Sequence, residues 1–199
     1  MTDPVSAAAD QLDAAVAATI AALQPTTDID WARAATDLTW SVFDTAEHLA
    51  SCLIGYAGQV VGQPTEGWVV PDVPLESGMS PAAVITYVGA AGGILASVVR
   101  TAAPDARGYH PYGTSDPVGF AAMGVVESLV HTYDIRLTAG QPWALPAGPA
   151  EFALRRLFPD APAGSPTDVL LWCTGRTSWG EHPRRTQWRW DSTVRPLGG

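Results

Sequence analysis

The chain has no lysine: all 11 of its basic residues are arginine, set against 20 acidic residues. It also has only two cysteines, Cys52 and Cys173, in segments whose patterns indicate a helix and a strand. Two separate cysteines form neither a disulfide framework nor a zinc-knuckle spacing, so a reducing compartment, the cytoplasm, is the expected location. The use of arginine in place of lysine, together with abundant alanine, glycine and proline, indicates a GC-rich genome. It therefore says nothing about the function of the protein.

The excess of negative charge is confined to the first three quarters of the chain. Residues 1–150 have 15 acidic residues and four arginines, whereas residues 151–199 have five acidic residues and seven arginines. An acidic body repels nucleic-acid phosphates, so no DNA or RNA partner is expected. The arginines of the tail are expected to pair with the acidic body.

Targeting and membrane-spanning segments are not expected either. The N-terminal segment lacks a basic region, and Asp10 and Asp13 interrupt its apolar residues, which is unlike a secretory signal. Residues 82–99 have no charge, a length at the edge of what spans a bilayer. Their weakly apolar composition favours a buried bundle helix instead.

Four segments have the start and stop signals of long helices. Each opens with a capping residue, followed in three cases by the proline that suits a first helical position; the starts are Asp3-Pro4, Ser41, Ser80-Pro81 and Asp116-Pro117. Asp44 is placed to form a capping box with Ser41. The stops are Pro25, Gly62 with Pro64, the residue before Pro104, and Gly140.

These segments predict an all-α four-helix bundle over residues 1–146. Apolar residues between positions 42 and 60 recur in steps of four and three, which is typical of a bundle helix. Gly89, Gly92 and Gly93 would let a neighbouring helix approach the third helix closely. The long, proline-rich connection from 62 to 80 predicts a crossover over the end of the bundle.

The pattern changes after residue 146. Residues 151–158 are typical of a short helix, while residues 169–174 and 186–190 are typical of two strands, the second with alternating polarity. Residues 147–199 are therefore predicted to form a small C-terminal α/β extension packed on the bundle, not a second independent domain.

Three side chains in the bundle suggest a metal site. Glu127 and His131 are four residues apart, so on a helix they share a face with Cβ atoms about 6 Å apart. Two ligand atoms so placed can bind one ion at roughly 2.0–2.2 Å each. His48, near the middle of another predicted helix, can add a second imidazole from a facing helix. The alternative is a solvent-facing Glu–His pair and a separate core histidine.

If the three residues meet, they leave at least one coordination position open, which is typical of catalytic metal ions. Two imidazoles and a carboxylate suit Zn²⁺ best, with Ni²⁺, Mn²⁺ and Fe²⁺ as alternatives. The prediction is therefore one divalent metal ion bound by His48, Glu127 and His131.

The two segments that supply these residues resemble a known family. Trp40-Ser-Val-Phe-Asp-Thr-Ala-Glu-His-Leu and Glu127-Ser-Leu-Val-His-Thr-Tyr-Asp134 resemble the DinB/YfiT-like metalloenzyme superfamily, and within it the metal-binding domain of mycothiol-dependent maleylpyruvate isomerase. The resemblance covers roughly residues 5–140 and implies the same three metal ligands, with mycothiol or a similar thiol as cosubstrate. A metal-held thiolate can isomerise an activated alkene or conjugate to an electrophile.

Other residues near the predicted site have competing interpretations. Asp44 and Cys52 lie one turn either side of His48, where each could supplement the metal, although capping and core packing also explain them. Asp134 shares the face of Glu127 and can orient a ligand, hold a substrate group, or pair with the nearby Arg136 or with another neighbour.

Three further candidates lie outside the two segments. His110, in the loop before the fourth helix, is either a cofactor contact at a pocket mouth or part of a plain turn. Arg176 and Arg189 can each clamp a substrate carboxylate. Asp134 and Arg176 are taken as the catalytic candidates and His110 as the cofactor-binding one.

The leading hypothesis is a cytoplasmic, metal-dependent thiol transferase or isomerase that acts on a small electrophilic substrate, as a monomer or homodimer. Two alternatives stay open: a non-catalytic metal-binding helical module, and a hydrolase in which metal-bound water attacks.

Overall fold

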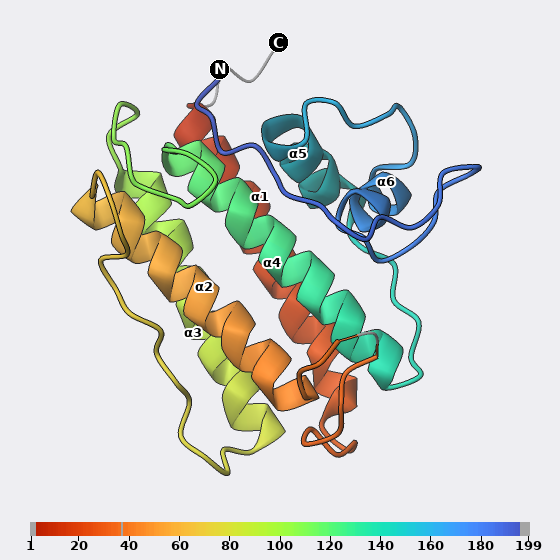
Figure 1. Cartoon of the computed structure of the whole chain (residues 1–199). Helices are drawn as coiled ribbons and strands as arrows, with labels where there is room; N and C mark the ends of the chain where they lie inside the picture. Colours follow the sequence, from red (N-terminus) through yellow and green to blue (C-terminus); the bar gives the residue numbers. More distant parts are fainter. Residues whose placement is uncertain (1–2, 37, 196–199) are drawn as a thin grey trace.

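A computed structural model describes residues 3–36 and 38–195. Its frame is four long helices: α1 (Pro4–Leu23), α2 (Val42–Gly62), α3 (Pro81–Thr101) and α4 (Pro117–Thr138) (Figure 1). A single 3₁₀ turn, η1 (Gln24–Thr26), extends α1, and two short helices, α5 (Ala147–Leu157) and α6 (Pro166–Cys173), follow the bundle. The predicted all-α four-helix bundle is confirmed.

The helices begin where the sequence signals predicted. Four side chains accept a hydrogen bond from a backbone N–H of the first helical turn, and these N-caps are Asp3, Ser41, Ser80 and Asp116. The predicted capping box is present at α2, because Asp44 in turn accepts from the backbone N–H of Ser41. Gly140, with φ of +67°, follows the end of α4 in the left-handed conformation that favours glycine.

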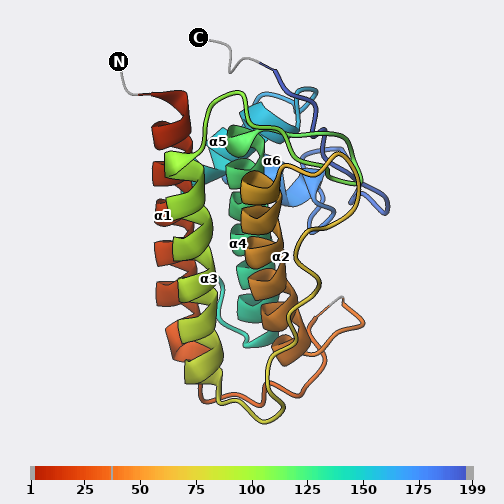
Figure 2. The same cartoon turned by 90° about the vertical axis from the view of Figure 1, so that its left-hand side faces the viewer.

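The chain direction explains the long connection between α2 and α3. In both views α1 and α4 run one way while α2 and α3 run the other, so two consecutive helices are parallel (Figures 1 and 2). Residues 63–80 therefore return along the whole length of α2. The predicted path over the end of the bundle is wrong. Side chains of α2 hold this crossover: Gln59 accepts from Val69 N, and Glu47 accepts from Leu75 N.

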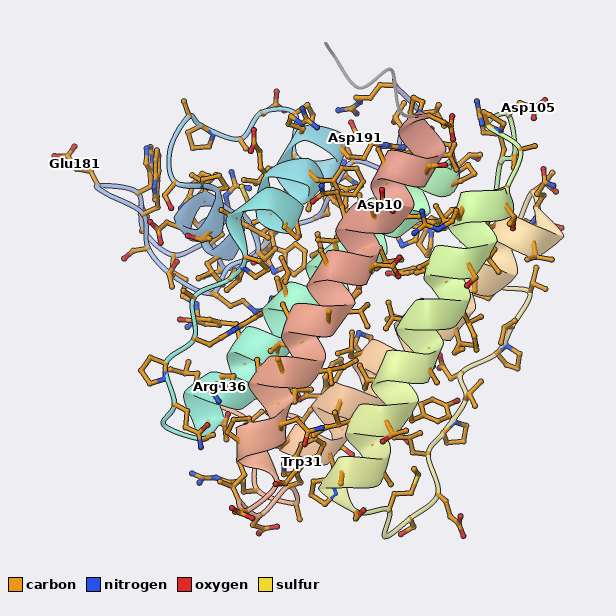
Figure 3. The ribbon with its side chains drawn as sticks, turned by 180° about the vertical axis from the view of Figure 1, so that it is seen from behind. Asp10, Trp31, Asp105, Arg136, Glu181 and Asp191 are labelled. Atoms are coloured by element: carbon orange, nitrogen blue, oxygen red, sulfur yellow. The ribbon has the colours of Figure 1, made fainter. Side chains whose placement is uncertain are left out.

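Helix α4 lies at the centre of the molecule. It packs against α1 and α2 within the bundle and against α5 on its outer side, so nearly all its residues are buried. Seen from behind, α1 and α3 cover the opposite side of the bundle (Figure 3). Gly124 of α4 is the point where leucines of three helices converge, since a Cβ there would meet Leu12, Leu53 and Leu95.

The predicted strands of the C-terminal extension are wrong. Residues 169–174, predicted as a strand, lie almost entirely within α6, and residues 186–190 have no strand partner. No strand occurs in the described ranges, only isolated bridges. A short apolar run is ambiguous between helix and strand, and here the Ser165-Pro166 start decides for a helix. The predicted helix at 151–158 is confirmed as α5, beginning four residues earlier.

Tail arginines pair with the acidic body, as the charge distribution predicted. Arg156 of α5 is fully buried, and its Nη2 donates to Asp116 Oδ1 at 2.8 Å. Its Nη1 donates to the carbonyl of Thr193 at 3.1 Å. Arg156 thereby joins the start of α4, α5 and the C-terminal segment. The division of the chain at residue 146 stays a prediction.

Helix α3 is the one described helix that is long and apolar enough to cross a membrane by length and composition. A core helix passes the same test, and α3 packs here against α1 and α2. That the protein makes no membrane contact stays a prediction.

The glycines of α3 divide by their surroundings. A Cβ at Gly89 or Gly92 would lie 2.9 Å from Ile20 or 2.5 Å from Val16, so the backbones of α1 and α3 approach closely there. A Cβ at Gly93 would meet nothing within 4 Å. The predicted close approach is confirmed for Gly89 and Gly92 and is wrong for Gly93.

This contrast predicts opposite effects of the same substitution. Gly92→Ala should lower the free energy of unfolding by about 1–3 kcal/mol, because the new methyl group overpacks against Val16. Gly93→Ala should raise it by up to about 1 kcal/mol, since alanine is the better helix former. Urea denaturation of both variants measures the difference. Equal effects at the two positions would contradict the close approach of α1 and α3 at Gly92.

Candidate metal site

The structure brings the three predicted metal ligands together. His48 comes from the second turn of α2, and Glu127 and His131 come from successive turns of the neighbouring α4. One ligand atom of each residue lies within 4.8 Å of the others. His131 Nε2 is 3.0 Å from Glu127 Oε2, and His48 Nε2 is 3.8 Å from the same oxygen.

Two of the three separations are close to those around a first-row divalent cation. Two ligand atoms each about 2.1 Å from a tetrahedral ion lie about 3.4 Å apart, which falls between the 3.0 and 3.8 Å that separate Glu127 from the two histidines, while His48 and His131 lie within 4.8 Å of each other. The donors are the nitrogen, oxygen and nitrogen that suit Zn²⁺, so the cluster can hold a metal ion.

The three ligands differ in exposure, and this difference gives the site a direction. The side chains of Glu127 and His131 are each 9% exposed, whereas that of His48 is 39% exposed. A groove of about 320 Å³ lies beside His48. It is lined by the N-terminal half of α2, by the residue before the N-cap of α2 and by the crossover: Trp40, Asp44, Glu47, His48, Ser51, Asp72, Val73 and Pro74. A small molecule can therefore approach from the side of His48.

Trp40 covers the two imidazoles. Its ring centroid lies 4.7 Å from that of His48 and 6.4 Å from that of His131. Sequence reasoning included Trp40 only as the first residue of a resembling segment. Trp40 lies eight residues before His48 and ahead of the start of α2, so no helical spacing in the sequence predicts that the two rings are in contact. Asp44 lies on the groove wall and belongs to the capping box, outside the ligand cluster.

Glu127 is ionised despite its burial. Burial raises the pKa of its carboxyl group, but the hydrogen bond and charge of His131 and the proximity of His48 outweigh this and bring the pKa below its usual value. The hydroxyl of Tyr56 donates to Glu127 Oε1 at 3.0 Å and adds to the effect. The sequence pattern placed Tyr56 only among the apolar residues between positions 42 and 60. Its position two turns after His48 on the same helix was the one signal that it could reach the site.

His131 is held between two carboxylates. Its Nδ1 lies 3.3 Å from Asp134 Oδ2, within ion-pair distance although outside hydrogen-bond geometry. Burial alone would lower the pKa of His131, but Asp134 and Glu127 outweigh it and raise the pKa to about 9. In the metal-free protein at neutral pH this ring is therefore an imidazolium, and a metal ion would take the place of the proton on Nε2.

The C-terminal extension reaches the site through Arg176. Its Nε and Nη2 donate to the two carboxylate oxygens of Asp134 at 3.2 and 2.7 Å. Of the two suggested pairings of Asp134, the one with Arg136 is wrong, because Arg136 donates to Gln141 and to the carbonyl of Ala22 near the C-terminal end of α4 (Figure 3). These contacts make Asp134 and Arg176 positioning residues for His131; a catalytic role for either is still a prediction.

The remaining candidates lie around the site rather than in it. Cys52 Sγ is 3.4 Å from His48 Nε2 but outside the ligand cluster. His110 is buried beyond Tyr56 in an aromatic cluster, and burial lowers its pKa to about 4. Its Nδ1 accepts from the backbone N–H of Tyr112, which accords with a structural turn. Arg189 lines a separate cavity of about 480 Å³.

Removing the charge behind His131 should weaken metal binding. Asp134→Asn keeps the shape but loses the carboxylate that orients the ring, so we expect a 10- to 100-fold weaker Zn²⁺ affinity in competition with a chromophoric chelator. Asp191→Asn, which breaks an Asp–Arg pair elsewhere in the extension, is the control and should leave the affinity unchanged. An Asp134 variant that binds as tightly as the parent would contradict the positioning role.

The metal-free protein should lose stability as the pH rises above neutrality. The folded-state pKa of His131, about 9, exceeds its unfolded value near 6.5, so its contribution is full below pH 6.5 and is lost as pH rises through 9. We expect the free energy of unfolding to fall by about 1 kcal/mol per pH unit between pH 6.5 and 8.5. Urea denaturation after treatment with a chelator measures it, and a constant value over this range would refute the assignment.

Comparison with known proteins agrees with this geometry at the level of the superfamily. A model of the DinB superfamily matches residues 11–135, which include α2, most of α4 and all three clustered side chains. No curated protein and no solved structure matches the chain. Because the matched segment covers more than half of the 199 residues, the chain belongs to the DinB superfamily.

Proposed function

We propose that this protein is a metal-dependent enzyme that uses a low-molecular-weight thiol, such as mycothiol, for S-transfer or cis–trans isomerisation of a small electrophilic substrate. The observation that supports it best is the cluster of His48, Glu127 and His131, with two ligands in the interior and the third beside a groove. Three protein ligands and an accessible side are what a catalytic metal ion needs.

The residues around the cluster would support such chemistry. A divalent cation bound there would favour the thiolate form of a thiol, which is the nucleophile for addition or displacement. Glu127 supplies the fixed negative charge and Tyr56 keeps its second oxygen occupied. Trp40 packs beside the imidazole of His48, and Asp134 lies against the ring of His131. Zn²⁺ is the favoured ion, with Ni²⁺, Mn²⁺ or Fe²⁺ as alternatives.

The thiol part of the proposal rests on the resemblance of residues 40–49 and 127–134 to the mycothiol-dependent maleylpyruvate isomerase family. The groove adds an electrostatic preference of its own. Asp44, Glu47 and Asp72 line it and none of the described arginines does, so a neutral thiol and a neutral or cationic electrophile would enter more readily than a dianion.

The metal requirement is tested by elemental analysis. We expect about one divalent ion per chain in the parent protein and none in His48→Ala, because two remaining ligands on one helix bind weakly. His182→Ala, at an exposed histidine of the extension that stacks on Trp179, is the matched control and should retain the ion.

The reaction is tested with a panel of electrophiles, including activated cis-alkenes, with and without mycothiol. The proposal predicts turnover that requires both thiol and metal and that is lost in His48→Ala. Equal turnover without thiol would contradict it in favour of a hydrolase. A metal-loaded protein that turns over none of the panel with thiol would favour a non-catalytic module.

A further inference from the structure

Cys52 lies beside the metal cluster without a role so far. It follows His48 by one turn of α2, and its Sγ is 3.4 Å from His48 Nε2. Without a metal ion, burial and the nearby negative charge of Glu127 both raise the pKa of this thiol well above its usual value. The other cysteine, Cys173, lines the separate cavity in the extension.

We propose that Cys52 is a fourth protein ligand, whose sulfur completes the coordination of the ion held by His48, Glu127 and His131 when no external thiol is present. This inference rests on the metal site of the proposed function. Ligand atoms N and S at about 2.1 and 2.3 Å from a tetrahedral ion lie about 3.6 Å apart, close to the 3.4 Å between Cys52 and His48.

Coordination needs one small movement and one proton. The sulfur lies outside the cluster of ligand atoms, so the proposal requires the thiol to move toward the ion when the ion binds. The S–H bond breaks, its proton passes to solvent, and the sulfur forms its bond to the cation. No oxidant or reductant takes part.

The proposal changes how a thiol cosubstrate would bind. With three ligands and Cys52 the site is closed, as in structural metal sites. An incoming thiol must displace Cys52, and its proton then passes to the Cys52 sulfur as it takes the fourth position. One thiolate replaces another, so the net charge of the site is unchanged. Ligands that bind the metal more weakly than a thiolate would not displace Cys52.

Cobalt substitution tests the assignment by spectroscopy rather than activity. Co²⁺ added to the metal-free protein should give a sulfur-to-cobalt charge-transfer band in the near ultraviolet for the parent chain and for Cys173→Ser. Cys52→Ser should bind one Co²⁺ and lack the band. Circular dichroism verifies the fold of each variant, and X-ray absorption of the zinc form should show one sulfur at about 2.3 Å that disappears only in Cys52→Ser.

The outcomes separate the two proposals. One bound Co²⁺ in the parent protein without the band, or a band that persists in Cys52→Ser, would overturn the assignment of Cys52 and leave the proposed function standing. Failure of the parent protein to bind Co²⁺ would overturn both. N-acetylcysteine added to the Co²⁺ form of Cys52→Ser should restore the band; a band present only with Cys52 would support this ligand and count against an external thiol.

Discussion

The carboxylate of Glu127 in the interior of the bundle is the constraint on which the rest of the site depends. An ionised carboxylate cannot stay buried without partners. Here the partners come from two helices: His131 from its own helix, and His48 and Tyr56 from α2. One oxygen of this carboxylate faces two imidazole nitrogens, and these three atoms are also the predicted ligands of a metal ion. The partners that allow the acid to be buried are therefore the same groups that would bind a cation.

The same reasoning accounts for the C-terminal extension. A cationic His131 between two acids leaves the outer acid, Asp134, in need of a positive partner, and α4 offers none on that face. Arg176, which follows α6, supplies it with two hydrogen bonds. Arg156 does the same at the start of α4, where it binds Asp116. The extension therefore covers the outer face of α4 and neutralises the two acids that lie there.

The sequence indicated the parts of this structure that depend on local signals. Helix starts at Ser41 and Asp116 are decided within one turn, and the spacing of Glu127 and His131 places both on one face. The partner of Asp134 was beyond reach, since Arg136 is two residues away and Arg176 is 42 residues away, and only the packing of α6 decides between them. The same limit applies to residues 169–173, where the burial of every residue removes the periodicity that separates helix from strand.

The topology of the bundle also determines how the site is reached. Parallel neighbours such as α2 and α3 need a connection as long as the helices, and this connection must lie against the outer face of one of them. It lies along α2, the helix that carries His48, and Ser51 donates to Asp72 while its own oxygen accepts from Val73 N. One wall of the groove is thus the crossover and the other is α2, so the ligand most exposed to solvent is the one beside this connection. The acids of the crossover and of α2 then set the charge that an entering molecule meets, while Arg176 of the extension acts on the cluster from the side of His131, through Asp134.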